Sequence, residues 1–267
     1  MIAGNGRFPL LALETARQLG HEVIVVAIRG EASTDLEKLA AACHWITIGE
    51  LSKLIDILKQ EHVTEVMMTG QVKHVSIFSS IRPDWRLFKL LASLKEKNTD
   101  ALIGGVAKVL QDEGIRLVDS TMLLKPLLAG AGVLTKRKPD AGEAHDVRYG
   151  RRIAGALAGL DVGQSVAISE RACVAIEAME GTDAMLRRAA ALVNGRPLRL
   201  VKASRGRGHL LFDVPVTGLN TINVMKETGT TVLAMDAGRT LMLDKEEMLA
   251  QADRAELCIV GHAPTEL

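Results

Sequence analysis

The sequence is poor in several features that mark specialised classes of protein. Aromatic residues make up only 3% of the 267 residues, which argues against a surface that stacks on nucleic-acid bases. The formal net charge is +1, so no overall field draws the chain to nucleic acid or to an anionic membrane. The three cysteines, Cys43, Cys173 and Cys258, lie far apart in apolar segments, and they predict buried thiols in a reducing compartment rather than disulfides or a zinc site.

Long apolar runs are missing as well. No run reaches the roughly 18 residues that a membrane span requires, and no signal peptide opens the sequence. We therefore expect a soluble, cytoplasmic protein. The rest of the composition is that of a globular protein, with 48% hydrophobic and 24% charged residues. A chain of this length forms one large domain or two of ordinary size.

Strand-like and helix-like segments alternate along the N-terminal half. Runs rich in β-branched or apolar residues, such as 22–28 and 65–69, are separated by helical stretches. This alternation predicts a Rossmann-like parallel sheet with helices on both faces, which we place at residues 1–130. The glycine- and charge-rich stretch 131–143 predicts a linker. Strands and helices alternate again over 144–267, which predicts a second, smaller α/β domain.

A glycine turn follows the first expected strand. Gly4-Asn5-Gly6 begins like the G-x-G-x-x-G turn of dinucleotide-binding domains, but Pro9 stands in place of the third glycine. Arg29 follows the second strand, where an acid would bind a ribose hydroxyl. A nicotinamide oxidoreductase is therefore disfavoured. Two interpretations stay open for the turn: a phosphate or sugar-nucleotide contact, and a tight strand-to-helix turn without a ligand.

The stretch from Cys173 to Arg188 predicts a strand that runs into a helix, with Thr182 or Asp183 as the N-cap. The turn between them carries Glu180 and Asp183 and exposes a helix N-terminus. Such a turn can hold a metal through its acids or an anion through its N–H groups. A capped helix start with solvated acids is the alternative.

Short motifs spread along the chain carry a family resemblance: Ile2–Pro9, Gly70–Lys73, Thr99–Leu102, Leu160–Gln164, Glu180–Arg188 and Asp213–Gly218. Together they resemble the UDP-2,3-diacylglucosamine diphosphatases of lipid A biosynthesis, of the LpxI type. The resemblance implies two α/β domains with the active site in the cleft between them, usually in a homodimer. It also implies hydrolysis of the diphosphate bond to 2,3-diacylglucosamine 1-phosphate (lipid X) and UMP with a divalent metal such as Mg²⁺, and it allows peripheral contact with the inner face of the cytoplasmic membrane.

The resemblance also assigns site residues. Asp213 matches the functional aspartate of the family, so it is the expected catalytic residue and metal ligand, with turn chemistry as the alternative. Asp183 and Glu180 are the other expected metal ligands. The residues expected to bind substrate or phosphate are Gly4, Asn5, Gly6, Gln71, Lys73, Gly181, Thr182, Arg187 and Lys202. Arg205 and Arg207 extend the basic stretch after Lys202, which either clamps the diphosphate or is a solvated loop.

Other phosphoesterase motifs are absent from the sequence. It contains no H-E-x-x-H, no calcineurin-like motif pair and no Nudix-type run of glutamates, and its seven histidines are scattered. Carboxylates are therefore the expected ligands, which favours Mg²⁺. The chain departs from the family pattern in three places. Only Met1 precedes Ile2, so we expect a shortened first strand or a start upstream of Met1. The segment 202–209 lacks the family's usual Lys-Pro and Gln-Asp content, and Leu211 replaces a basic residue.

One helix-like stretch suits a lipid substrate. Residues 81–91 place Trp85, Phe88 and Leu91 near one face with basic residues around them, which predicts an interfacial or acyl-binding helix. A surface helix that packs its apolar face on the core is the alternative. The competing hypothesis for the whole chain is a non-catalytic nucleotide-sugar sensor on the same two domains, which would need the glycine turns and basic groups but not Asp213.

Overall fold

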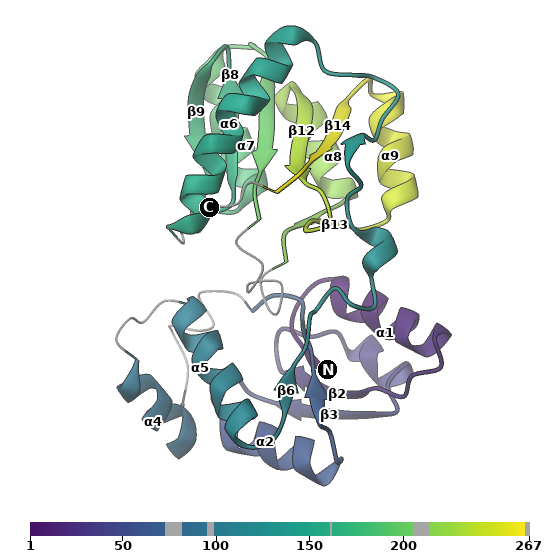
Figure 1. The fold of residues 1–267 in the computed structure, drawn as a ribbon, viewed down its shortest axis with the longest axis vertical. Helices are drawn as coiled ribbons and strands as arrows, with labels where there is room; N and C mark the ends of the chain where they lie inside the picture. The colour runs from purple at the N-terminus through teal and green to yellow at the C-terminus, as the bar shows by residue number, and fades with distance from the viewer. Residues whose placement is uncertain (73–81, 95–98, 161, 205–213, 265–267) are drawn as a thin grey trace. The chain divides into compact units, whose positions relative to one another are not determined.

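The computed structural model describes residues 1–72, 82–94, 99–160, 162–204 and 214–264. The chain divides into two α/β units, Met1–Leu124 and Lys125–Leu267 (Figure 1). The second unit is the longer of the two, so the expectation of a smaller second domain is wrong. Within the described residues, no helix is long and apolar enough to cross a bilayer.

The stretch 131–143 is not a linker. Gly132–Val133 forms strand β7, which pairs antiparallel with β14 (Cys258–His262). Helix α6 (Ala141–Gly159) begins inside the same stretch, where Asp140 forms a capping box with the third residue of the helix. The glycine of this stretch therefore lies in a strand of the second sheet, and one of its charged residues caps a helix.

The first unit contains a parallel sheet, as the alternation of segments predicted. Its elements in chain order are β1 (Ile2–Ala3), α1 (Phe8–Gln18), β2 (Ile24–Ile28), the 3-10 helix η1 (Thr34–Lys38), β3 (Ala42–Ile46), α2 (Leu51–Gln60), β4 (Glu65–Val66), β5 (Met68–Thr69), α4 (Trp85–Ser93), α5 (Thr99–Asp112) and β6 (Arg116–Leu117). The strand order is β3-β2-β1-β5, with every pairing parallel. Strands β4 and β6 pair parallel as a separate ribbon.

The core of the first unit lies between this sheet and the helices α2, α4 and α5. Helix α2 repeats leucine and isoleucine at helical spacing, so that Leu51, Leu54, Ile55 and Leu58 are all buried against the sheet. Each such side chain contributes about 1.5–3 kcal/mol by leaving water. This packing fixes the carboxyl ends of β1 and β5, where the glycine turn lies.

The second unit is built on a six-stranded sheet of order β7-β14-β12-β10-β8-β9. Its other elements in chain order are η2 (Lys125–Leu127), β8 (Ser165–Ser169), β9 (Ala172–Ile176), α7 (Thr182–Val193), β10 (Leu198–Lys202), β11 (Val216–Thr217), α8 (Leu219–Thr228), β12 (Thr230–Asp236), β13 (Leu241–Met242) and α9 (Lys245–Arg254). Strands β10, β12 and β14 are parallel, and β8 runs antiparallel to β10. Strand β9 reverses again, so it runs in the direction of β10.

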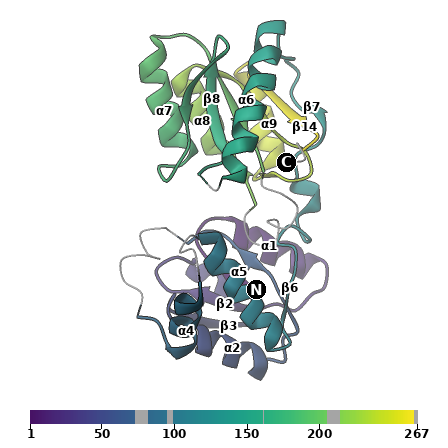
Figure 2. The same cartoon turned by 60° about the vertical axis from the view of Figure 1, so that its left-hand side comes forward.

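Helices cover both faces of the second sheet (Figure 2). Helix α6 packs on one face, where Gly150 lets it approach closely: a Cβ there would lie 2.7 Å from Cγ2 of Val201. The other face carries α7, α8 and α9, whose buried side chains include Met185, Ile222 and Met248. Both faces of the sheet are therefore closed, and its strand ends are left as the positions for polar groups.

Candidate functional site

Polar side chains gather at one edge of the second sheet, where β9, β10, β12 and β14 end and β8 begins. Lys202, Asp236 and His262 are the last residues of β10, β12 and β14, and Ser165 opens β8 opposite Lys202. Helix α7 also starts at this edge, directly after β9. Open α/β sheets bind their ligands at the carboxyl ends of parallel strands. We call this edge the carboxyl edge of unit 2.

The hydroxyl of Thr182 is the centre of the polar contacts at this edge. Lys202 Nζ donates to Thr182 Oγ1 at 3.2 Å, and Thr182 Oγ1 donates to Glu177 Oε1 at 2.9 Å. Ser165 Oγ lies 3.2 Å from the same hydroxyl. The second carboxyl oxygen of Glu177 is buried and has no partner among the described residues. The edge thus holds an ammonium group and an incompletely satisfied carboxyl group close together.

Helix α7 begins with a glycine, which corrects the prediction of Thr182 or Asp183 as its N-cap. Gly181 is the N-cap, with φ +83° and ψ 162°, and among the described residues the helix start has no side-chain cap hydrogen bond. The positive φ favours glycine at this position. Because the first backbone donors lack a side-chain cap and the helix dipole is positive there, this end is suited to an anion.

Both acids of the turn have partners of their own. Glu180 accepts from the backbone N–H of Ala178 at 3.0 Å and pairs with Arg188, which also donates to the carbonyl of Ile176. The pKa of Glu180 is held below its usual value by its own backbone N–H and by the Arg188 guanidinium. Asp183 accepts from the amide of Asn220 at the start of α8. These contacts fix the turn and join α7 to α8.

Arg187 points to an acid on the neighbouring helix. Its Nε donates to both carboxylate oxygens of Glu227 at 2.9 and 3.1 Å, and its Nη2 donates to one of them at 2.9 Å. This bidentate pair is exposed and lies about one helical turn beyond the start of α7. The structure therefore gives Arg187 a partner on α8 in place of an anion at the helix start.

A second polar group at the carboxyl edge was not predicted from the sequence. Asp236 is buried and accepts from the backbone N–H and the hydroxyl of Ser204 at 2.7 and 2.8 Å. Arg151 of α6 approaches the other oxygen of Asp236 at 3.4 Å. Nε2 of His262 is buried without a hydrogen-bond partner in the part of the chain that is described. Burial and the positive Arg151 lower the pKa of His262, although Asp236 opposes them.

The glycine turn of the first unit packs against the end of β5. Asn5 and Gln71 exchange backbone hydrogen bonds of 2.6 and 3.0 Å. A Cβ on Gly4 would lie 2.5 Å from the carbonyl oxygen of Gln71, and one on Gly70 would lie 2.4 Å from the carbonyl oxygen of Asn5. Gly6 has φ +96° with open space around it. The structure thus brings Gly4, Asn5, Gly6 and Gln71 together, and close backbone approach explains Gly4 and Gly70.

Other expected site residues lie outside the described residues: Asp213, Lys73, Arg205 and Arg207. Two of the three expected metal ligands, Glu180 and Asp183, are described, and each has the partner given above. Among the residues that the structure describes, no three His, Cys, Asp or Glu side chains form a group that could hold a metal ion.

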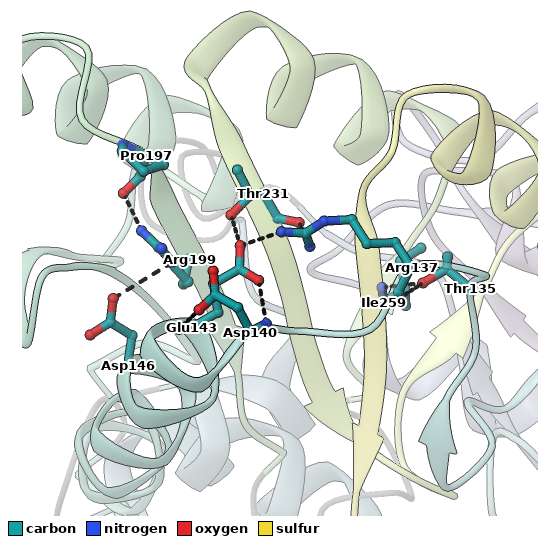
Figure 3. Close-up of polar contacts among 9 residues, drawn as sticks. All are labelled: Thr135, Arg137, Asp140, Glu143, Asp146, Pro197, Arg199, Thr231 and Ile259. Atoms are coloured by element: carbon teal, nitrogen blue, oxygen red, sulfur yellow. Dashed lines mark hydrogen bonds and ion pairs between the residues drawn. The ribbon is translucent and has the colours of Figure 1, made fainter.

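A buried ion network lies at the opposite edge of the second sheet (Figure 3). Glu143 accepts from Arg137 and from the hydroxyl of Thr231 at 2.7 and 2.6 Å. Asp146 accepts from the backbone N–H of Arg171 at 2.8 Å and lies 3.6 Å from Nε of Arg199. Its members bind the start of α6 to the starts of β10 and β12. The paired charges indicate a role in stability for this network.

The fold and the carboxyl edge define a class: an α/β protein with a basic and carboxyl cluster, beside an uncapped helix start, at the ends of parallel strands. The family is shown by comparison. Models of the LpxI N-terminal domain and the LpxI C-terminal domain match residues 1–127 and 130–260. The chain belongs to the LpxI family, which confirms the resemblance drawn from the motifs.

A curated relative spans the whole chain. The UDP-2,3-diacylglucosamine pyrophosphatase LpxI of Caulobacter vibrioides is 31% identical over 276 residues, which cover 100% of this chain and 98% of that protein.

Solved structures are only distantly similar. The biotin carboxylase domain of a thermophilic 2-oxoglutarate carboxylase bound to ADP is 10% identical, with a TM-score of 0.26 over 62% of this chain and 34% of that one. The same domain from Hydrogenobacter thermophilus is 13% identical, again with a TM-score of 0.26, over 64% and 34% of the two chains. This chain thus spans about a third of the length of either structure, and such low scores carry no argument about fold or activity.

Proposed function

We propose that the protein hydrolyses the diphosphate bond of UDP-2,3-diacylglucosamine in lipid A biosynthesis, giving 2,3-diacylglucosamine 1-phosphate and UMP. Support comes from membership of the LpxI family over both domains and from the full-length relative that is named as this pyrophosphatase. The observation that carries the proposal is the carboxyl edge of unit 2. It joins a lysine to a helix N-terminus without a side-chain cap, and both groups favour the binding of a diphosphate.

The roles of the residues follow from their chemistry. Lys202 and the backbone N–H groups at the start of α7 hold the diphosphate and offset the charge that develops on its oxygens. Thr182 positions the Lys202 ammonium through its hydroxyl. Asp213 lies outside the described residues, and its assignment as the group that activates water rests on the family motif. Transfer of the water proton to a carboxylate is general base catalysis, which typically contributes about 10²–10⁴-fold.

A divalent metal, Mg²⁺ by preference, stays part of the proposal as a prediction. When bound, it would withdraw charge from the phosphoryl oxygens and lower the pKa of a water molecule. The described residues contain no group of three His, Cys, Asp or Glu side chains that could hold it, so the proposal gives it Asp213 and substrate oxygens as ligands. Activity that disappears in EDTA and returns with Mg²⁺ better than with Zn²⁺ would support it, and full activity after exhaustive chelation would refute it.

The first unit is proposed to contact the nucleotide or its phosphates. The order β3-β2-β1-β5 supports a Rossmann-like interpretation, in which ligands bind at the carboxyl ends of the strands. The turn formed by Gly4, Asn5 and Gly6 occupies such an end beside Gln71. Asn5→Ala should raise KM for the substrate if this contact exists. The homodimer that the family resemblance implies is a separate prediction, which light scattering tests.

The experiment is direct. Purified protein is incubated with UDP-2,3-diacylglucosamine in detergent micelles, with Mg²⁺ or with EDTA, and UMP is measured by chromatography. UMP and 2,3-diacylglucosamine 1-phosphate in equal amounts are the expected products. Tight substrate binding without any UMP, under every divalent cation tried, would refute hydrolysis and favour the nucleotide-sugar sensor.

A further inference from the structure

Helix α4 (Trp85–Ser93) carries two apolar faces that differ in what covers them. One face carries Leu87 and Leu90, which are buried in the core of the first unit, and Leu91, which packs against that core together with the C-cap residue Leu94. The expectation that Leu91 shares a face with the aromatic residues is therefore wrong. The apolar residues of the opposite face do not belong to this core, so core packing does not account for them.

The opposite face is formed by Trp85 and Phe88. Trp85 is 74% exposed and Phe88 is 54% exposed, and their rings stack with centroids 5.9 Å apart and planes inclined by 23°. The exposed Lys89 lies next to Phe88, and the exposed Arg82 precedes the helix. We call Arg82, Trp85, Phe88 and Lys89 the α4 patch. Two large aromatic side chains are thus held together in water on a chain that has few of them.

The helix beneath the patch is firmly placed. Asp84 caps it by accepting from the N–H of Leu87 at 2.9 Å, and its other oxygen accepts from the N–H of Ser52 on α2 at 2.6 Å. On the α5 side, a Cβ on Gly105 would lie 2.6 Å from Leu90 Cδ1, which shows how closely α5 approaches. The aromatic pair is therefore presented by a helix anchored on two neighbours.

The charges around the patch favour a negative partner. Residues 82–94 contain three basic residues, Arg82, Arg86 and Lys89, and a single acid, Asp84, which is engaged as the cap. Arg86 pairs with Glu113, which also pairs with Lys59, so this trio retains one positive charge. A second copy of the chain would bring the same positive face against itself, which disfavours self-association through the patch.

We propose that the α4 patch docks the protein on the surface of an anionic lipid bilayer. Tryptophan and phenylalanine enter the boundary between headgroups and acyl chains, and flanking lysine and arginine bind anionic headgroups. The proposal deepens the proposed function, because a diacylated substrate resides in a bilayer, but docking itself requires no substrate. With two aromatic side chains and few charges, the binding is reversible and depends on anionic lipid.

The test is flotation of the full-length protein with vesicles of phosphatidylcholine alone or mixed with phosphatidylglycerol. We expect binding to the mixed vesicles and at least about tenfold less binding for Trp85→Ala/Phe88→Ala. Arg82→Gln/Lys89→Gln should lose roughly fivefold per charge on the mixed vesicles. Leu19→Ala is the matched control, since Leu19 is 60% exposed in the same unit and outside the patch, and it should bind as the wild type does.

Fluorescence locates the contact. The sequence has two tryptophans, so Trp45→Phe leaves Trp85 as the single indole. Its emission should shift to the blue when mixed vesicles are added, because the exposed ring leaves water. An unshifted spectrum, or wild-type binding by Trp85→Ala/Phe88→Ala, would overturn the proposal. Failure of the wild type to float, together with a dimer on gel filtration that Trp85→Ala/Phe88→Ala abolishes, would overturn it in favour of a second copy.

The outcome is separable from that of the proposed function. Activity on substrate dispersed in detergent micelles does not require the α4 patch, so Trp85→Ala/Phe88→Ala should release UMP from micelles at the wild-type rate. A protein that binds mixed vesicles through the patch but releases no UMP would refute the proposed function alone. A protein that releases UMP from micelles but does not bind the mixed vesicles would refute the docking proposal alone.

Discussion

Thr182→Val tests the polar centre of the carboxyl edge. The substitution keeps the shape of the side chain but removes the hydroxyl that accepts from Lys202, donates to Glu177 and lies beside Ser165. Loss of this hydroxyl should lower the free energy of unfolding by about 1–3 kcal/mol. It removes the hydrogen bond to one oxygen of Glu177, and the other oxygen already has no partner among the described residues. For a unit of this size, that loss lowers Tm by roughly 2–10 °C.

Calorimetry of the wild type and three variants measures the effect. Thr182→Ser retains the hydroxyl and should recover most of the lost stability. Thr240→Val is the matched control, because Thr240 is fully buried and its hydroxyl has no partner among the described residues. That replacement should be neutral or stabilising. Equal Tm values for Thr182→Val and the wild type, or equal losses for Thr182→Val and Thr240→Val, would refute the contacts assigned to Thr182.

Three further predictions concern other parts of the molecule. Burial raises the pKa of Glu143, but hydrogen bonds from Arg137, Thr231 and the backbone of Asp140 lower this pKa overall. Its contribution to stability is therefore complete above the ordinary carboxyl pKa and is lost as pH falls through the lowered value, so Glu143→Gln should flatten the acid side of a plot of Tm against pH. Gly70→Ala should cost about 3 kcal/mol in urea unfolding and Gly20→Ala only about 1, because both have positive φ but only Gly70 meets a neighbouring backbone. Lys202→Met should lower kcat/KM about 10²-fold with little change in Tm, and an equal loss in the exposed control Lys226→Met would contradict a specific role.

Much of the fold follows from local patterns in the sequence. The strand-like run at 22–28 contains β2 (Ile24–Ile28), and the alternation of strands and helices predicted the parallel sheet of the first unit. These features depend on hydrophobic periodicity and on breaks at glycine, which neighbouring residues determine. The linker prediction failed because Gly132–Val133 pairs with a strand more than 120 residues later, and composition does not report such pairing.

Residues of the candidate site were predictable from the sequence only where they belong to, or lie near, a family motif. Thr182 and Lys202 were expected at the site, and the structure joins them. Asp236 and His262 were missed because each ends an apolar strand far from any motif, although the position of polar residues at strand ends was a usable signal. The pairing of Arg187 with Glu227 depends on how α7 packs beside α8, which the sequence around Arg187 does not determine.

The central claim is tested most directly by comparing the rates at which the wild type and the Asp213→Asn variant hydrolyse UDP-2,3-diacylglucosamine. The substitution keeps the size of the side chain and removes the negative charge that a general base requires. We predict that the wild type releases UMP from UDP-2,3-diacylglucosamine, while Asp213→Asn folds, binds the substrate and releases UMP roughly 10²–10⁴-fold more slowly. A folded Asp213→Asn protein with near-native turnover would show that the catalytic carboxylate lies elsewhere, and a folded wild type that binds substrate without releasing UMP would contradict the account as a whole.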